Sequence, residues 1–279
     1  MSFLTRFARQ WIAGETLDDA IARAKKENNA GIRAIINFLG EHVKDEAEAD
    51  NNVEENLRIL RAIEESKTSA SLSIKLTQLG LDIDKSLCLS KVDKIVSAAS
   101  SKNIFVWIDM ENSPYTQDTI GIYLDIIKKY KGVGIVIQAN LKRSEGDVAI
   151  IVASAGIVRL VKGAYMEREE IAYTSRSDIT RNFSKLMAYL FYKSPFFAIA
   201  THDDRLINEA IEANKIHQKM IEFQMLMGVR DELKRKLVKE GFTVVDYIPY
   251  GKNWFPYTTR RIRERKRNIL LIVRSVFDI

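Results

Sequence analysis

The chain has 279 residues, of which 46% are hydrophobic and 29% charged, proportions that indicate a globular protein with a sizeable core rather than a disordered chain. The net charge of +6 permits nucleic acid or an anionic membrane surface as a partner without requiring either. The single cysteine, Cys88, excludes an intramolecular disulfide, and one Cys with three His argues against a structural zinc site. Because no apolar stretch approaches the ~20 residues of a transmembrane helix, we expect a cytoplasmic protein that could at most rest peripherally on the inner face of the membrane.

Short apolar runs alternate with longer stretches of helical character along the chain. Residues 1–31 are expected to form one or two short covering helices, one of them starting after the N-cap Thr16. The predicted strands are Ala34–Leu39, Leu72–Leu76, Ile104–Ile108, Gly134–Ile137, Ile157–Val161, Phe196–Ala200, Phe223–Leu226 and Val244–Ile248. The predicted helices are Asp45–Ser66, Lys85–Ser100, Thr116–Tyr130, Ser144–Ser154, Glu167–Tyr192, Asp203–Met220, Arg230–Glu240 and Asn253–Phe277.

Eight strand–helix units predict one (β/α)₈ barrel over residues 1–279, since parallel strands need long crossover connections. An open doubly wound sheet is the alternative, but no Gly-x-Gly-x-x-Gly follows the first strand.

Polar side chains lie at or near the end of almost every predicted strand. They are Glu41, Lys75, Asp109, Glu111, Gln138, Asn140, Arg159, Lys162, Thr201, His202, Gln224 and Tyr247. Charged groups are costly in apolar strands unless they are paired, and barrel enzymes carry their chemistry at the carboxyl ends of the strands. The pattern therefore favours an enzyme over a non-catalytic barrel.

The segment Arg159–Tyr165, which reads Arg-Leu-Val-Lys-Gly-Ala-Tyr, places two cations at a strand end. Gly163 permits a close approach of the backbone to a bulky group. Two interpretations remain open for these cations. Arg159 and Lys162 either pair with carboxylates such as Asp109 or Glu111, or bind an anion or a cofactor.

A second motif, Tyr257-x-x-Arg260-Arg261-x-x-Glu264, lies in the last predicted helix. Offsets of three, four and seven put Tyr257, Arg261 and Glu264 on one helical face, and the adjacent arginines could hold a carboxylate over the barrel rim. The basic residues 263–267 are expected to face solvent. His202 is either a hydrogen-bonded rim residue or a general base, whereas His42, His217 and Cys88 are assigned structural roles.

Together these segments resemble the catalytic barrel of the proline dehydrogenase family, flavin enzymes that oxidise L-proline to Δ1-pyrroline-5-carboxylate. The resemblance runs from residues 13–16 to residues 274–277. Its specific parts are Arg159–Tyr165, Ala200-Thr201-His202 and the motif that begins at Tyr257.

The resemblance implies FAD lying across the carboxyl ends of the strands, with Arg159 hydrogen-bonded near flavin N5. It places Met110 and Gln138 beside the flavin ring, and Lys162, Gly163, Ala164, Thr201 and His202 along the polar chain of the cofactor. Two positions depart from the family pattern. Met166 replaces the aromatic residue that often stacks on adenine, and Asp203 replaces the Asn that often follows Thr-His.

For the substrate, the resemblance implies a carboxylate clamp and an apolar wall around the proline ring. The clamp consists of Lys75, Arg260 and Arg261, and the wall of Leu160, Tyr165, Tyr247 and Tyr257. Asp109 is the electrostatic partner of the cations, and Glu41 is the gate residue that pairs with Arg260. The resemblance further implies a membrane quinone as electron acceptor. A chain of this length leaves no room for a Δ1-pyrroline-5-carboxylate dehydrogenase, so we expect a separate enzyme; neither nucleic acid nor a metal ion is expected.

Two rival functions are weighed against this interpretation. A Schiff-base aldolase on the same barrel would use Lys75 or Lys162 as nucleophile, which requires a depressed lysine pKa. A basic module binding nucleic acid through residues 260–267 would show steep salt dependence, but it leaves the polar strand ends unexplained.

Overall fold

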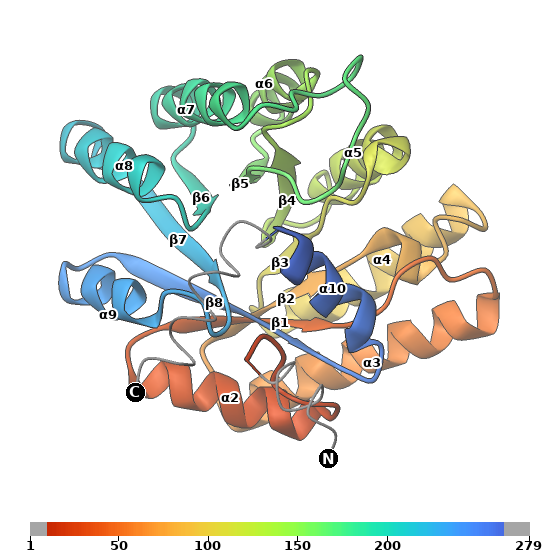
Figure 1. The fold of residues 1–279 in the computed structure, drawn as a ribbon. Coiled ribbons are helices and arrows are strands. Elements are labelled where there is room, and N and C mark those ends of the chain that lie inside the picture. The colour runs from red at the N-terminus through yellow and green to blue at the C-terminus, as the bar shows by residue number, and fades with distance from the viewer. Residues whose placement is uncertain (1–9, 265–279) are drawn as a thin grey trace.

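The computed structural model describes residues 10–264, and for residues 260–264 it describes the backbone alone. Eight parallel strands close into one barrel in sequence order, because β8 pairs with β1 (Figure 1). The strands are β1 (Arg33–Phe38), β2 (Ala70–Ile74), β3 (Val106–Ile108), β4 (Val133–Gln138), β5 (Ile157–Val161), β6 (Phe196–Ala200), β7 (Met220–Leu226) and β8 (Thr243–Tyr250). The predicted (β/α)₈ barrel is thereby confirmed.

Helices surround the barrel and alternate with its strands (Figure 1). They are α2 (Leu17–Asn29), α3 (Glu46–Ser66), α4 (Lys85–Ser101), α5 (Thr116–Ile127), α6 (Ser144–Ala153), α7 (Arg176–Lys193), α8 (Asp204–His217), α9 (Asp231–Lys239) and α10 (Trp254–Glu264), with short 3₁₀ helices η1 (Leu76–Leu79) and η2 (Ser113–Tyr115). In the part of the chain that the structure describes, no helix combines the length and the apolar character needed to cross a bilayer.

The predicted helix Glu167–Tyr192 is wrong at its start, since α7 begins only at Arg176. Ser175 is the N-cap, and its hydroxyl accepts the backbone N–H of Asp178 at 3.1 Å. Glu167 is not helical: its carboxylate accepts the N–H of Ser113 at 2.8 Å and the Ser113 hydroxyl at 2.6 Å. The segment between β5 and α7 is therefore tied to the loop after β3.

The predicted N-cap Thr16 is confirmed. Its hydroxyl accepts the N–H of Asp19 at 3.2 Å, and the Asp19 carboxylate accepts the N–H of Thr16 at 3.1 Å, which completes a capping box. Helix α2 packs against β1 and β8 and buries Ala20 and Ala24 completely. Residues 1–9, which belong to the expected N-terminal cover, lie outside the described residues.

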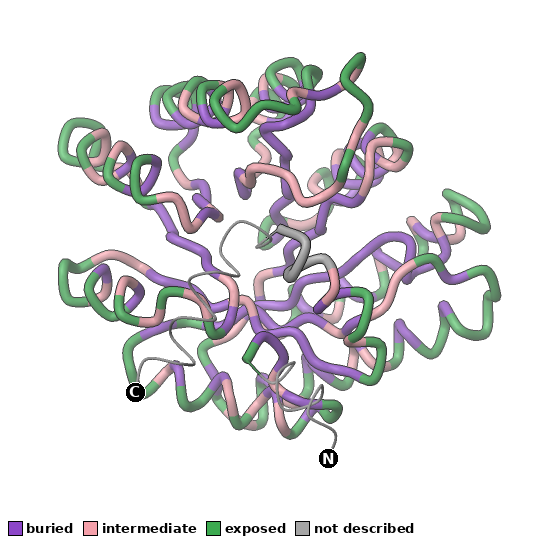
Figure 2. The backbone as a smooth tube through the Cα atoms, viewed as in Figure 1, coloured by how far each residue is buried: buried purple, intermediate pink, exposed green. Residues whose placement is uncertain are grey.

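Side chains alternate between two faces of each strand. Those that point outward join the main core between the barrel and its helices, as Val158 and Leu160 do on β5. Inside the barrel, Ile35, Trp107, Ala198 and Val245 form a separate buried cluster. In Figure 2 the strands are mostly buried, whereas exposed residues gather on the helices and loops around them.

Cys88 on α4 is fully buried, as the sequence predicts. Burial raises the pKa of its thiol to about 12.

Candidate active site

The carboxylate of Asp109, just past β3, is the centre of a hydrogen-bonded cluster at the carboxyl end of the barrel. Oδ2 accepts from Lys75 Nζ at 2.9 Å and from the Tyr247 hydroxyl at 2.8 Å. Oδ1 accepts from the Ser73 hydroxyl at 2.7 Å and from the guanidinium of Arg159. The predicted strand ends of β2, β3, β5 and β8 thus meet at one carboxylate.

Within this cluster, Asp109 and Lys75 each favour the charged form of the other. Burial acts to raise the pKa of Asp109, but Lys75 and Arg159 outweigh it and hold that pKa well below its usual range. Burial also acts to lower the pKa of Lys75, but Asp109 outweighs it and holds that pKa well above its usual value. A lysine with a raised pKa is a poor Schiff-base nucleophile, so Lys75 does not suit the aldolase interpretation.

Arg159 on β5 points into the lumen between two aromatic rings. Its guanidinium carbon lies 5.1 Å from the centroid of the Trp107 ring and 5.6 Å from that of Tyr247. Of the two interpretations offered for this cation, pairing with Asp109 is what the structure shows, and Arg159 is 4% exposed. Pairing with one carboxylate that Lys75 shares leaves an excess of positive charge, which suits an anionic partner.

Leu160 does not lie where the resemblance implies. Alternation along β5 turns its side chain away from the lumen and into the main core, where it is fully buried. We therefore omit Leu160 from the wall of the candidate pocket.

Gly163, two residues past β5, lies against the side chain of Asn140 from the loop after β4. The φ angle of Gly163 is +108°, and a Cβ there would be 2.1 Å from Asn140 Oδ1. Asn140 Oδ1 is buried and has no hydrogen-bond partner among the described residues. A close backbone approach beside a buried acceptor without a partner fits a bound group that carries hydroxyl donors, as the ribityl chain of FAD does.

Gln138, at the end of β4, links the loop after β3 to the segment after β5. Its Nε2 donates to the backbone oxygen of Glu111 at 2.9 Å, and its Oε1 accepts the N–H of Ala164 at 3.4 Å. Met110, between Asp109 and Glu111, is buried at the same rim. Met166, at the position where the family often has an aromatic residue, is 97% exposed.

Lys162 pairs with a carboxylate, as one of the two open interpretations holds, but not with Asp109 or Glu111, which that interpretation named as examples. Its Nζ donates to Asp203 Oδ2 at 2.5 Å and to the Thr180 hydroxyl at 3.1 Å. Asp203 also accepts the N–H of Arg205 at 3.0 Å as the N-cap of α8. The departure from Asn at position 203 therefore supplies an anion to Lys162.

Thr201 and His202 end β6 at the same rim, with Thr201 buried. The Thr201 hydroxyl accepts the N–H of Asp203 at 3.2 Å. His202 Nε2 accepts the N–H of Leu226 at 3.0 Å, which requires the proton of a neutral ring to sit on Nδ1. This arrangement favours the rim role of His202 over a general base at Nε2.

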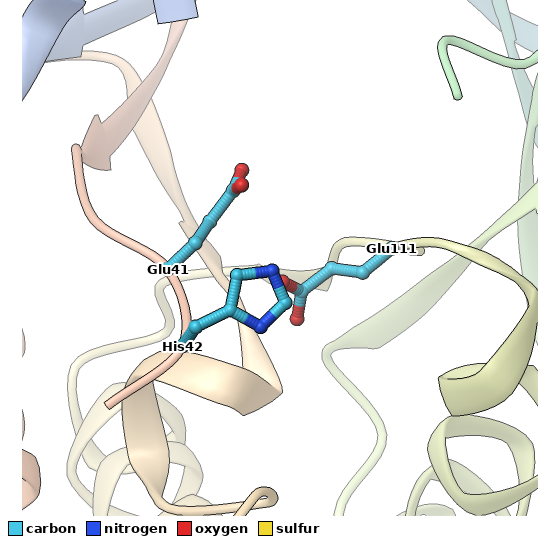
Figure 3. Close-up of side chains that lie close together, drawn as sticks. All are labelled: Glu41, His42 and Glu111. Atoms are coloured by element: carbon cyan, nitrogen blue, oxygen red, sulfur yellow. The ribbon is translucent and has the colours of Figure 1, made fainter. Parts of the chain in front are cut away.

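Glu41, His42 and Glu111 form the group of potential metal ligands in the described part of the chain, with ligand atoms within 4.8 Å of one another. Figure 3 shows the His42 ring beside the Glu111 carboxylate, with Glu41 extending from the loop that carries His42. Glu111 already accepts the N–H of Thr77 at 3.0 Å and its hydroxyl at 2.6 Å. Burial raises the pKa of Glu111. Because both of its carboxylate oxygens are already engaged by Thr77, we assign no metal ion to this group.

Tyr165 and Glu41 both lie close enough to Lys75 to influence its pKa. Tyr257 on α10 is buried with Trp11, Ile12 and Leu39. Arg260 and Arg261 fall within α10, but their side chains, and so the expected Glu41–Arg260 pair, lie outside the described residues.

The sequence interpretation missed three contacts in the lumen. Ser73 and Trp107 lie two residues before Lys75 and Asp109, and Gln224 accepts from Arg159 at 3.3 Å. Period-two alternation is the signal that could have found Ser73 and Trp107, because residues two apart share a face of the strand.

Comparison with known proteins identifies the family of this barrel. The family model described as proline dehydrogenase matches residues 20–269. The chain belongs to the proline dehydrogenase family. It is 35% identical to proline dehydrogenase 1 of Bacillus subtilis over 272 residues, which cover 96% of this chain and 90% of that protein. It is 30% identical to the proline dehydrogenase of Deinococcus radiodurans over 277 residues, covering 96% and 89%.

Solved structures of larger proteins share the barrel of this proline dehydrogenase family member. Proline utilization A from Bdellovibrio bacteriovorus, crystallised after inactivation by N-propargylglycine, aligns with a TM-score of 0.86 at 24% sequence identity. The alignment covers 92% of this chain and 32% of the other, so this chain spans about a third of that protein. At this identity the similarity supports the fold.

Proposed function

We propose that this chain oxidises L-proline to Δ1-pyrroline-5-carboxylate with bound FAD as the oxidant. The observation that carries the proposal is the buried cluster in which Asp109 holds Lys75 and Arg159, together with the close approach of Gly163 to Asn140 past the ends of β5 and β4. Membership of the proline dehydrogenase family supports the substrate and the reaction class.

In this proposal the cofactor would be held at the carboxyl ends of the strands. Arg159 would face the flavin ring near N5, where a cation would stabilise negative charge on the ring. Met110 and Gln138 would border the ring, and Lys162, Gly163, Ala164, Thr201 and His202 would hold the polar chain. Asn140 adds a hydrogen-bond acceptor to that set.

The substrate has one strong handle, its carboxylate. Lys75, Arg260 and Arg261 bind it, because paired guanidinium groups match carboxylate geometry. Tyr165, Tyr247 and Tyr257 form the wall around the pyrrolidine ring, and Glu41 closes the site by pairing with Arg260.

The reaction removes two electrons and two hydrogens from proline and forms a C=N bond. Bound FAD supplies the acceptor for the hydride that leaves C5 of proline. Fixing the carboxylate orients C5, which has to lie ~3–3.5 Å from its acceptor. Because its pKa is raised, Lys75 stays charged and binds the carboxylate rather than taking the amine proton, which passes to solvent.

Reoxidation of the flavin requires an acceptor, which we propose to be a membrane quinone reached by a cytoplasmic protein resting on the inner face of the membrane. Δ1-Pyrroline-5-carboxylate then passes to a separate dehydrogenase. Nucleic acid has no role in this proposal.

The visible spectrum of the purified protein is the first test. We expect a yellow protein whose flavin absorbance bleaches when L-proline is added without oxygen, and whose flavin is released by acid precipitation. Flavin that stays in the acid pellet would contradict non-covalent binding. A colourless protein trapped by borohydride with a carbonyl substrate would contradict the oxidation and support the aldolase.

A further inference from the structure

A chain of hydrogen bonds runs from Arg159 down the barrel lumen to its amino end. Arg159 Nη1 donates to Gln224 Oε1 at 3.3 Å, and Gln224 Nε2 donates to Glu222 Oε2 at 3.0 Å. Arg33 Nη1 then donates to Glu222 Oε1 at 3.0 Å. Gln224 and Glu222 lie two residues apart on β7, so both point into the lumen, where they are 3% and 9% exposed.

The chemistry of its neighbours fixes which way the Gln224 amide points. A guanidinium can only donate hydrogen bonds, and an ionised carboxylate can only accept them. Between Arg159 and Glu222, the amide therefore has to turn its oxygen toward Arg159 and its nitrogen toward Glu222. Turning the amide over would break both contacts, so Glu222 locks Gln224 in the orientation that serves Arg159.

Gln224 and Asp109 hold the two ends of the Arg159 guanidinium. Nη1 reaches Gln224, and Nη2 reaches Asp109 and the Ser73 hydroxyl. The rings of Trp107 and Tyr247 lie 5.1 and 5.6 Å from the guanidinium carbon. With both terminal nitrogens hydrogen-bonded and two rings packed close by, the guanidinium keeps one orientation at the carboxyl end of the barrel.

Gln224 also acts as a neutral spacer. It keeps the carboxylate of Glu222 one side chain away from Arg159, so Asp109 is the carboxylate in direct contact with Arg159 among the described residues. Asp109 is shared with Lys75. Direct contact with one shared carboxylate therefore leaves the charge of Arg159 only partly compensated, and its field acts over a few ångström in a medium of low dielectric.

We propose that Gln224 and Glu222 are positioning residues that orient Arg159 toward the flavin and preserve its positive charge. The inference rests on the proposed function, because it takes Arg159 to face the flavin ring. Glu222 acts through Gln224, and Gln224 acts through Arg159; neither touches the reacting atoms.

The test compares two variants of the FAD-loaded protein, Gln224→Glu and Gln224→Leu. Gln224→Glu keeps the size of the side chain but sets a second carboxylate against Arg159, so we expect a lower reduction potential for the bound flavin. Gln224→Leu removes the contact without adding charge, and we expect kcat to fall roughly 10- to 100-fold through misorientation, with KM nearly unchanged.

The variants Glu222→Gln and Glu222→Leu distinguish the effect of the hydrogen bond that orients Gln224 from the effect of a side chain that only fills the space. Glu222→Gln can still accept from Gln224, so it should retain more activity than Glu222→Leu. Asn56→Leu is the matched control, because it removes another buried amide, one on α3 that donates to the backbone oxygen of Asn52 at 2.7 Å. Its potential and kcat should equal those of the wild type, whatever stability it loses.

Wild-type flavin content and proline oxidation are measured first, so a failure of the proposed function is seen before any variant is compared. A reduction potential of Gln224→Glu equal to that of the wild type, or a kcat of Gln224→Leu no lower than that of Asn56→Leu, would overturn the positioning role. Should Gln224→Leu fail to fold, two comparisons still decide the question: the reduction potential of Gln224→Glu against wild type, and the activity of Glu222→Gln against Glu222→Leu.

Discussion

Asp109 and Arg159 are paired across the lumen although β4 lies between their strands. The intervening strand leaves room for this pair because Gly134 has no side chain. A Cβ there would lie 2.4 Å from the ring of Trp107, so the ring occupies that space and lies beside the guanidinium of Arg159. The geometry of the Asp109–Arg159 pair thus depends on Gly134, whose lack of a side chain makes room for the Trp107 ring.

Replacing Arg159 is expected to impair catalysis more than folding. Arg159→Met removes the cation that we propose lies near flavin N5, and loss of one such donor is expected to lower kcat by about 10²- to 10³-fold. Asp109 keeps Lys75, Tyr247 and Ser73 as partners, so the variant should still fold and carry FAD. Stopped-flow flavin reduction measures the effect, with Arg58→Met, at an exposed position of α3, as the control; unchanged reduction in Arg159→Met would remove this residue from the mechanism.

Asp109 should make stability depend on pH at the acid end. Since its pKa is lower folded than unfolded, its stabilisation is complete above the unfolded value of about 3.9 and is lost as pH falls toward the lower folded value. Asp109→Asn should unfold more easily than the wild type at pH 7, by about 3 kcal/mol.

Urea unfolding of the wild type and of Asp109→Asn, at pH 7 and at several values below pH 4, measures their free energies of unfolding. The difference in free energy of unfolding should shrink as the pH falls. A gap that stays constant down to pH 3 would contradict the depressed pKa.

Gly163→Ala tests the proposed cofactor cradle. Alanine is strained at a φ of +108°, and its Cβ would collide with Asn140, so we expect a loss of about 1–3 kcal/mol of stability together with weaker FAD binding. Gly146→Ala is the control, because a Cβ there, on α6, meets nothing within 4 Å, and should stabilise the helix by up to ~1 kcal/mol. FAD titration followed by fluorescence would count against the cradle if both variants bind equally well.

Tyr247 is expected to restrict the pocket around the proline ring. Its hydroxyl is fixed on Asp109 at 2.8 Å, so the ring cannot easily swing aside, and 4-hydroxyproline should be a poorer substrate than proline. Tyr247→Ser should narrow the ratio of the two kcat/KM values. Equal efficiency of the wild type on both imino acids would refute this role.

Arg261→Met should raise KM for proline severely, because binding of the carboxylate is lost in ground state and transition state alike. Glu41→Ala should act more mildly, lowering turnover and loosening retention of the substrate while FAD stays bound. Rapid-mixing measurements of flavin reduction against proline concentration distinguish the two effects. Wild-type proline affinity in Arg261→Met would show that the last helix does not form the clamp.

The barrel could be predicted because each strand carries its own local signal, a short apolar run between longer helical stretches. Local signals fail where distant contacts decide: the segment after β5 contains Glu167, which binds Ser113 instead of starting a helix. Lys162 likewise pairs with Asp203 rather than with a carboxylate in the loop after β3, since the sequence does not show which neighbouring loop is nearer. The face of Leu160 follows from its alternation with Arg159 on β5, because adjacent residues of a strand point to opposite faces.

The buried state of Cys88 also makes this protein convenient to label. Its thiol is the chain's only one, has no exposed surface and stays protonated at neutral pH because its pKa is raised. A cysteine introduced by Lys44→Cys, on the exposed loop that follows Glu41, should therefore be the one that a maleimide dye modifies in the native protein. A fluorophore at that position would report movement of the loop as proline binds, without a cysteine-free background having to be built first.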